Sequence, residues 1–190
     1  MFWCCVVRGP KNAFGSELSM TDKILQAFLE RQLAEGMALA ESSDLVDIVP
    51  LDLQHYVTRF HCKGLVRAAS GAIEVAEHFE AGIYFGPDHL RRLNPAEVVT
   101  WFGPPNVWHP NISPLLRAVC IGNMSAGVGL VELIYQLFEI ITWRRVTVHH
   151  GLNAEACQWA RNNRHHYPVD TCVLRRRELA LKFHKMRAAL

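Results

Sequence analysis

A cysteine in an irregular part of the chain is the residue best placed to do chemistry. Cys120 follows a proline-rich stretch at 103–114 and precedes a run of small residues, IGNMSAGVG, at 121–129. A thiol in such a segment can be exposed, and an exposed thiolate is a nucleophile. The alternative is that Cys120 is buried, because free cysteine is among the most buried residue types. Local sequence alone leaves both interpretations open.

Other reactive residue types are present, but they do not form a recognised metal or nucleotide motif. The chain has no P-loop, no GxGxxG and no Gly-x-Ser-x-Gly, so ATP, dinucleotide and serine-hydrolase chemistry lack support. Histidines and cysteines near the C-terminus lack the paired short spacing of a zinc site. We therefore expect no cofactor and no metal. The metal-capable residues in question are His149, His150, Cys157, His165, His166 and Cys172.

Length and composition predict a single domain with a substantial core. The chain has 190 residues, of which 50% are apolar and 20% charged, which excludes an intrinsically disordered protein. The apolar start, residues 1–7, lacks the features of a secretory signal. The longest apolar stretch, residues 128–143, contains Glu132 and Glu139 and is too short to span a bilayer. We expect a cytoplasmic protein with reduced cysteines and no membrane association.

The charge is unevenly distributed along the chain. The net charge is +2, but residues 1–160 carry 12 basic and 16 acidic side chains, whereas residues 161–190 carry 8 basic and 2 acidic ones. The overall balance gives no reason to expect a nucleic-acid binder. The basic tail could be a solvated face over a packed apolar stripe. It could instead bind an acidic protein, a lipid surface or nucleic acid.

Residue periodicity predicts an α+β domain. Apolar residues recur at helical spacing over 19–42, where Ser19 or Thr21 could cap the helix, and over 129–143. Alternation predicts about four short antiparallel strands, at 45–53, 56–67, 73–85 and 98–102. The proline-rich stretch cannot be helix or central strand, because proline lacks the N–H and fixes φ. Two further helices are expected, a short one at 153–162 capped by Asn153 and a basic one at 169–190.

The motifs around Cys120 resemble those of the ubiquitin-conjugating enzyme family. That family has a His-Pro-Asn tripeptide, then its active cysteine in an Ile-Cys-Leu-like segment. Here His109-Pro110-Asn111 is followed by Val119-Cys120-Ile121, with Cys120 nine residues after Asn111. The family's third strand is resembled by residues 82–85, and its proline turn by residues 87–88 and 95–98. The start of its next helix is resembled by residues 152–156. The resemblance spans about residues 20–162 and implies a UBC-like fold.

The resemblance implies a thioester mechanism. Cys120 would accept the C-terminal carboxyl of a ubiquitin-like protein from an activating enzyme, and an amine, usually lysine, of a protein substrate would then attack. Asn111 matches the family's asparagine, which is assigned either to the oxyanion or to holding the active loop. His109 and Pro110 are expected to be structural. The activating enzyme would contact the first helix, whose solvent face includes Lys23, Arg31 and Glu35, unless that face is only solvated.

The chain departs from the family at two places. Where eukaryotic members often carry an aspartate before the helix that follows the site, it has His149-His150-Gly151, and a neutral imidazole could take the lysine proton. The alternative is two loop histidines facing water. The family's tryptophan after the cysteine is replaced by Ser125-Ala126-Gly127. These departures favour a bacterial member of an operon-encoded conjugation system, of which some act in antiphage defence.

These inferences divide the chain into an extension (1–18), a conjugating-type catalytic domain (19–162) and a basic helical tail (163–190). The rival interpretation is a catalytically silent conjugating-type domain that serves as a binding scaffold, but such relatives usually lack the cysteine. A third possibility, an unrelated cysteine hydrolase, has no local signature.

Overall fold

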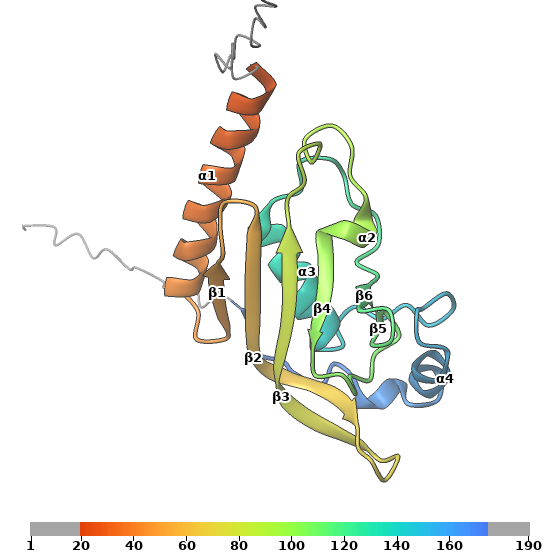
Figure 1. The fold of residues 1–190 in the computed structure, drawn as a ribbon. Helices are drawn as coiled ribbons and strands as arrows, with labels where there is room; N and C mark the ends of the chain where they lie inside the picture. The colour runs from red at the N-terminus through yellow and green to blue at the C-terminus, as the bar shows by residue number, and fades with distance from the viewer. Residues whose placement is uncertain (1–19, 175–190) are drawn as a thin grey trace, which may run out of the picture.

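One antiparallel sheet with helices on one side forms the fold (Figure 1). The structure is a computed structural model and describes residues 20–174. The sheet has six strands in the order β1-β2-β3-β4-β6-β5. The elements are α1 (Met20–Glu41), β1 (Val46–Pro50), β2 (His55–Arg67), β3 (Ile73–Tyr84), α2 (Pro95–Val98), β4 (Val99–Gly103), β5 (Ile112–Ser113), β6 (Ala118–Val119), α3 (Leu130–Ile141), α4 (Ala154–Asn162) and a 3₁₀ turn, Arg164–His166.

The four expected strands are confirmed as β1 to β4, and their alternation has the expected cause. In β2 the even-numbered residues from Tyr56 to Cys62 are buried, whereas their odd-numbered neighbours are exposed or half-buried. The buried side faces α3, whose apolar residues are almost all inaccessible to solvent. The other face of the sheet carries mostly polar and charged side chains. Two short strands, β5 and β6, were not expected, because two residues are too few to show a period.

A side chain on α1 caps the central helix α3. Gly129, the residue before α3, has no side chain to accept a hydrogen bond from the first turn. The buried Gln32 of α1 does so instead, its Oε1 accepting from Leu130 N at 2.7 Å. A Cβ on Gly129 would lie 2.7 Å from the same oxygen, so the close approach requires glycine. This contact ties the helix at the β1 side of the sheet to the helix beneath its centre.

A second, aromatic cluster joins the C-terminal elements to the sheet. Trp143, at the end of α3, contacts Trp159 of α4 at 5.3 Å between ring centroids and Tyr167 at 5.6 Å. The helix expected at 153–162 is confirmed as α4, and the Asn153 side chain accepts from Ala156 N as expected of its cap. None of the helices within residues 20–174 is both long and apolar enough to span a membrane.

The helix expected from Val169 is wrong over residues 169–174. This segment is irregular and packs on the domain, with Val169 N bonded to Thr142 O at 2.9 Å and Leu174 buried. The Asp170 carboxylate accepts backbone N–H groups from Cys172 and from Lys63 of β2. A local side-chain bond of this kind competes with helix formation. The predicted extension at 1–18 and the tail beyond 174 lie outside the described residues.

Candidate active site

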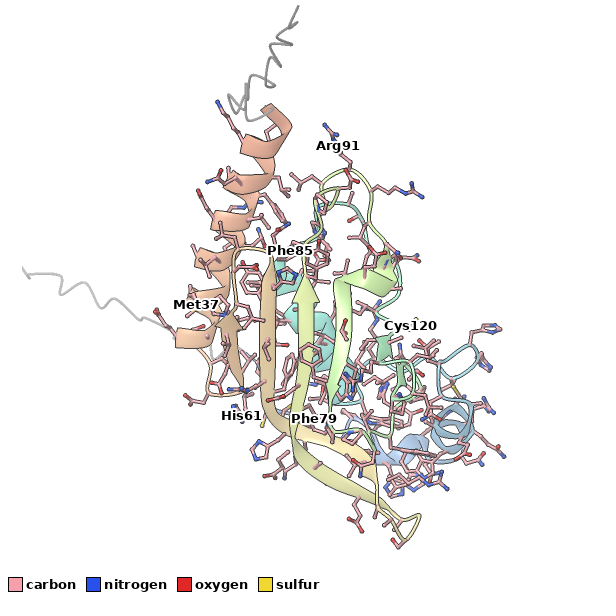
Figure 2. All side chains as sticks on the ribbon, in the orientation of Figure 1. Met37, His61, Phe79, Phe85, Arg91 and Cys120 are labelled. Atoms are coloured by element: carbon pink, nitrogen blue, oxygen red, sulfur yellow. The ribbon has the colours of Figure 1, made fainter. Side chains whose placement is uncertain are left out.

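The β5–β6 hairpin brings Asn111 and Cys120 together. Ile112 pairs with Val119 and Ser113 with Ala118, so the residues that flank the hairpin lie opposite one another. Cys120 N donates to Asn111 O at 2.7 Å, and Asn111 Nδ2 donates to Cys120 O at 2.9 Å. Figure 2 shows Cys120 on the β5–β6 side of the sheet, remote from Met37 of α1. The eight residues between Asn111 and Cys120 therefore form a hairpin that fixes the cysteine backbone.

The side-chain amide of Asn111 is fully used in holding the site. Asn111 is 1% exposed. Its Nδ2 donates to Thr147 Oγ1 at 3.1 Å as well as to Cys120 O, and its Oδ1 accepts from Thr147 N at 2.9 Å. Both N–H groups of the amide are thus engaged, so neither is free to bind an oxyanion. The geometry favours the loop-holding role of Asn111 over direct oxyanion stabilisation.

His109 is a buried, neutral side chain. Its Nδ1 accepts a hydrogen bond from Asn111 N at 3.0 Å, which places the ring proton on Nε2. The ring meets Trp143 edge to face, with centroids 4.7 Å apart. Burial lowers the pKa of His109 to about 3. Because its accepting nitrogen is occupied and its other nitrogen is buried without a partner, His109 cannot serve as a general base here.

The loop between α3 and α4 is fastened on both sides of His149 and His150. Before them, Thr147 is bound to Asn111, and Val148 O accepts from Arg161 Nη1 at 2.6 Å. After them, Asn153 N donates to Pro110 O at 3.2 Å. The two histidines are exposed, and neither makes a hydrogen bond, ion pair or ring contact with any residue in 20–174. They lie in a loop attached to the site but are not bonded to Cys120.

The described cysteines differ in how open their thiols are. Cys62 and Cys157 are buried, as expected, and desolvation raises the pKa of Cys62 to about 12. Cys172 is exposed, but the Asp170 carboxylate beside it raises the pKa of its thiol. Cys120 is half-buried. Among these four cysteines, Cys120 and Cys172 are the ones that are not buried.

A charged side chain lies against the residues that follow Cys120. Gly122 has φ +95°, a conformation that glycine adopts readily, and a Cβ there would lie 2.7 Å from Arg145 Nη2. The guanidinium of Arg145 therefore sits beside the turn that leads away from the cysteine. Sequence reasoning did not find Arg145 or Thr147, because their relevance depends on where the loop after α3 returns to the hairpin.

The hairpin turn also exposes two large apolar residues beside the site. Leu115 and Leu116 are 94% and 77% exposed, between Asn111 and Cys120. Adjacent leucines in a proline-containing turn were a signal for this feature, and sequence reasoning passed over it.

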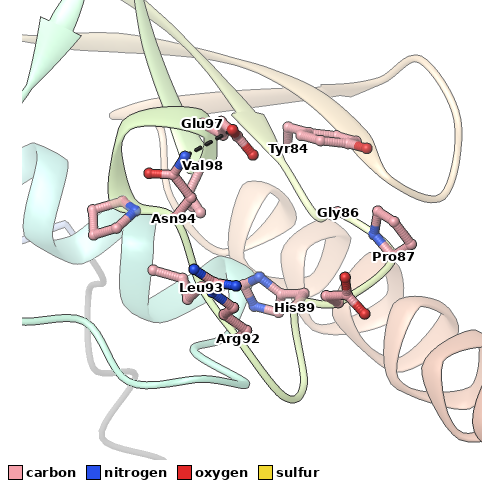
Figure 3. A pocket seen from close by; sticks show the side chains of 11 residues that line it. Tyr84, Gly86, Pro87, His89, Arg92, Leu93, Asn94, Glu97 and Val98 are labelled. Atoms are coloured by element: carbon pink, nitrogen blue, oxygen red, sulfur yellow. Dashed lines mark hydrogen bonds between the residues drawn. The ribbon is translucent and has the colours of Figure 1, made fainter.

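Two cavities of the described residues are formed by segments other than the one that carries Cys120. A cavity of about 600 Å³ is formed by the β3–β4 connection and is lined by residues including Tyr84, Asp88, His89 and Arg92. Figure 3 shows it, with the hydrogen bond from Asn94 Nδ2 to Glu97 Oε1 at its edge. A second, of about 240 Å³, lies between the β2–β3 hairpin and the start of α4. Cys120 lines neither of these two cavities.

The metal-capable residues near the C-terminus are not assembled into a cluster. Within the described part of the chain, no group of three or more histidine, cysteine, aspartate or glutamate side chains could share a metal ion. His165 and His166 contact one another, with ring centroids 4.2 Å apart. Cys157 is buried and donates to Thr147 O instead.

Comparison with known proteins identifies the fold. No family model matches the sequence, and no curated protein matches it either. A solved structure described as a novel ubiquitin-conjugating enzyme matches with a TM-score of 0.50 and 13% identity, over 76% of this chain and 90% of that one. The E2 domain of a Toxoplasma gondii ubiquitin-conjugating enzyme has a TM-score of 0.48 and 18% identity, over 76% and 92%. The chain has the ubiquitin-conjugating fold.

Proposed function

We propose that this chain carries a ubiquitin-like protein as a thioester on Cys120 and transfers it to a lysine amine of a protein substrate. The observation that carries the proposal is the double hydrogen bond between Asn111 and Cys120, which fixes a half-buried thiol on a ubiquitin-conjugating fold.

The chemistry is two acyl transfers. The Cys120 thiolate attacks the thioester carbonyl on the activating enzyme, and that enzyme's thiolate leaves as the new C–S bond forms. The lysine amine then attacks the carbonyl on Cys120, loses a proton, and expels the Cys120 thiolate as the amide forms. A thiolate suits both steps because it is a good nucleophile and a good leaving group.

The residues around Cys120 have three different roles in the proposed mechanism. Asn111 acts as a positioning residue that holds the Cys120 backbone against the loop at Thr147. Arg145, beside Gly122, supplies positive charge close to where negative charge develops in both steps. His149 or His150 accepts the proton of the attacking amine, which the exposure of this fastened loop allows.

A thioester assay tests the first step. The protein is incubated with the ubiquitin-like protein, its activating enzyme and ATP, then separated on gels with and without reductant. We expect a reductant-sensitive adduct that is absent in Cys120→Ala and kept in Cys172→Ala, an exposed control cysteine. An adduct that survives in Cys120→Ala would refute the assignment. Failure of the wild-type chain to form any adduct would favour the binding scaffold.

The second step is followed with preformed thioester and free lysine. The double variant His149→Ala/His150→Ala should form the thioester at the wild-type rate and discharge it more slowly, by about 10²-fold if an imidazole is the base. Replacing His165 and His166 by Ala is the matched control, since these histidines lie beyond α4. Equal slowing of both steps by the 149/150 variant would contradict the proposal.

The partners follow from the proposed chemistry. They are a ubiquitin-like protein, an activating enzyme and a protein substrate. Contact of the activating enzyme with the exposed residues Lys23, Arg31 and Glu35 of α1 is part of the same proposal. The bacterial, operon-encoded setting and a role in antiphage defence stay predictions from the departures at 125–127 and 149–151.

A further inference from the structure

Two histidines face one another on the open side of the sheet, away from the proposed thioester site. His61 of β2 and His78 of β3 are directly paired across the two strands. Their Nδ1 atoms are 3.3 Å apart, and the rings are nearly perpendicular, at 80°. His78 is exposed and His61 half-exposed, so both nitrogens can be reached from solvent. His61 is labelled in Figure 2.

The separation of the two nitrogens fits one bound transition metal ion. Zinc–imidazole bonds of about 2.0–2.1 Å at a tetrahedral angle put two ligand nitrogens roughly 3.3 Å apart. The observed 3.3 Å agrees with this value without movement of either strand. At 3.3 Å the two nitrogens are farther apart than in a usual hydrogen bond.

The second nitrogen of His61 has the partner that a metal-binding histidine needs. Its Nε2 lies 2.7 Å from the Oδ2 atom of Asp47 on β1. A carboxylate there favours the tautomer with the proton on Nε2, which leaves the Nδ1 lone pair directed at His78. The neighbouring Arg59 donates its Nε–H to Glu80 Oε1 at 2.8 Å. This N–H is therefore not available to bind Asp47.

We propose that His61 and His78 form a binding site for one divalent transition cation of the zinc or copper class, with Asp47 orienting His61. Imidazole nitrogens suit these metals and not magnesium or calcium. Water completes the coordination, because within residues 20–174 no third metal-capable side chain shares the position. Bound metal would link β2 to β3, and through Asp47 to β1, just before the pairing of β2 and β3 shifts register between His61 and Gly64.

The test is a titration of the full chain with ZnCl₂, with MgCl₂ as the negative control, followed by NMR of the histidine ring nitrogens. We expect zinc to shift the His61 and His78 rings together and magnesium to shift neither. His78→Gln should weaken zinc binding at His61 by about tenfold or more, and Asp47→Asn by about 10–100-fold.

His55→Gln is the matched control variant. His55 lies on the same strand, is exposed, and has its own carboxylate, Asp52, at 2.9 Å, but it stacks on Tyr84 instead of facing a second histidine. This variant should bind zinc at His61 as the wild type does. Unshifted His61 and His78 rings, or unchanged zinc binding in His78→Gln, would overturn the proposal. Because the readout is residue-specific, zinc bound at a cysteine elsewhere would not be mistaken for this site.

Discussion

At the scale of single residues, the site depends on the buried side chain of Asn111, in which both amide N–H groups and the amide oxygen are hydrogen-bonded. Asn111 makes three side-chain hydrogen bonds, to Cys120 and Thr147, and His109 accepts one from the Asn111 backbone. Buried polar groups stabilise a structure only when they are paired. The same bonds that hold Asn111 in place leave it no N–H for a substrate, so in the proposed transfer it acts through the position of the Cys120 backbone.

This role for Asn111 predicts a change that precedes any catalysis. Asn111→Ala should lower the free energy of unfolding by about 1–3 kcal/mol, because buried Thr147 and Cys120 backbone groups lose their partners. Amide hydrogen exchange should accelerate at 120–122 and 146–150 in the free protein. Thr147→Ala, which removes one of the three bonds, should have a smaller effect. Lost thioester formation with unchanged exchange would indicate a direct catalytic role instead.

At the scale of elements, two connections converge on the cysteine. The β5–β6 hairpin fixes its backbone, and the loop after α3 returns to the hairpin through Thr147 and Arg145. The two connections meet at the turn formed by Gly122. Its positive φ favours glycine, and a Cβ there would displace the Arg145 guanidinium.

Two glycine variants separate backbone strain from displacement of Arg145. Gly71 has φ +86° and open space where a Cβ would lie, with no other residue within 4 Å, whereas at Gly122, with φ +95°, a Cβ would lie 2.7 Å from Arg145 Nη2. Gly71→Ala and Gly122→Ala should each cost about 1–2 kcal/mol in unfolding experiments. Only Gly122→Ala should slow thioester formation, measured as the initial rate of adduct appearance. Equal rates for the two variants would argue against a role for this turn.

At the scale of the whole molecule, the helix-covered core and the aromatic cluster meet at the candidate active site. The core extends from α1 through α3 and the buried side of the sheet to Leu174, while the aromatic cluster around Trp143 supports His109 and α4. The opposite face of the sheet is polar, with paired charges such as Arg59–Glu80. Because His109 is buried against the aromatic cluster, it becomes exposed to water only when the cluster unfolds.

The buried His109 predicts a pH dependence of stability. Its pKa is about 3 in the folded protein, against 6.5 when exposed, because burial disfavours the charged ring. Between these values only the unfolded chain binds the proton, so the free energy of unfolding falls as the pH drops below 6.5. Urea unfolding at a series of pH values measures how the free energy of unfolding changes with pH. In His109→Asn the slope should correspond to up to about one proton fewer taken up on unfolding.

His109→Asn is a conservative replacement, because the oxygen of the new side chain can still accept a hydrogen bond from Asn111 N. His89, whose pKa burial also lowers, contributes to the slope in both proteins, so the difference isolates His109. An identical slope in wild type and His109→Asn would contradict the burial of a neutral ring.

The sequence by itself determined the elements that depend on local patterns. Alternation identified the strands that became β1 to β4, helical spacing identified α1 and α3, and an asparagine cap identified the start of α4. The order of the His-Pro-Asn motif and Cys120 pointed to the correct fold. These features can be recognised in the sequence, because side-chain periodicity and capping involve residues a few positions apart.

Only the tertiary structure decided what depends on pairing between distant segments. It formed β5 and β6, replaced the expected helix at 169–174 with an irregular segment bonded to Lys63, and capped α3 with Gln32. It also joined Asn111 to Thr147 and set His61 opposite His78. Such contacts are set by sheet register and by the packing of α3. A shift of one residue in register would send every side chain of a strand to the other face.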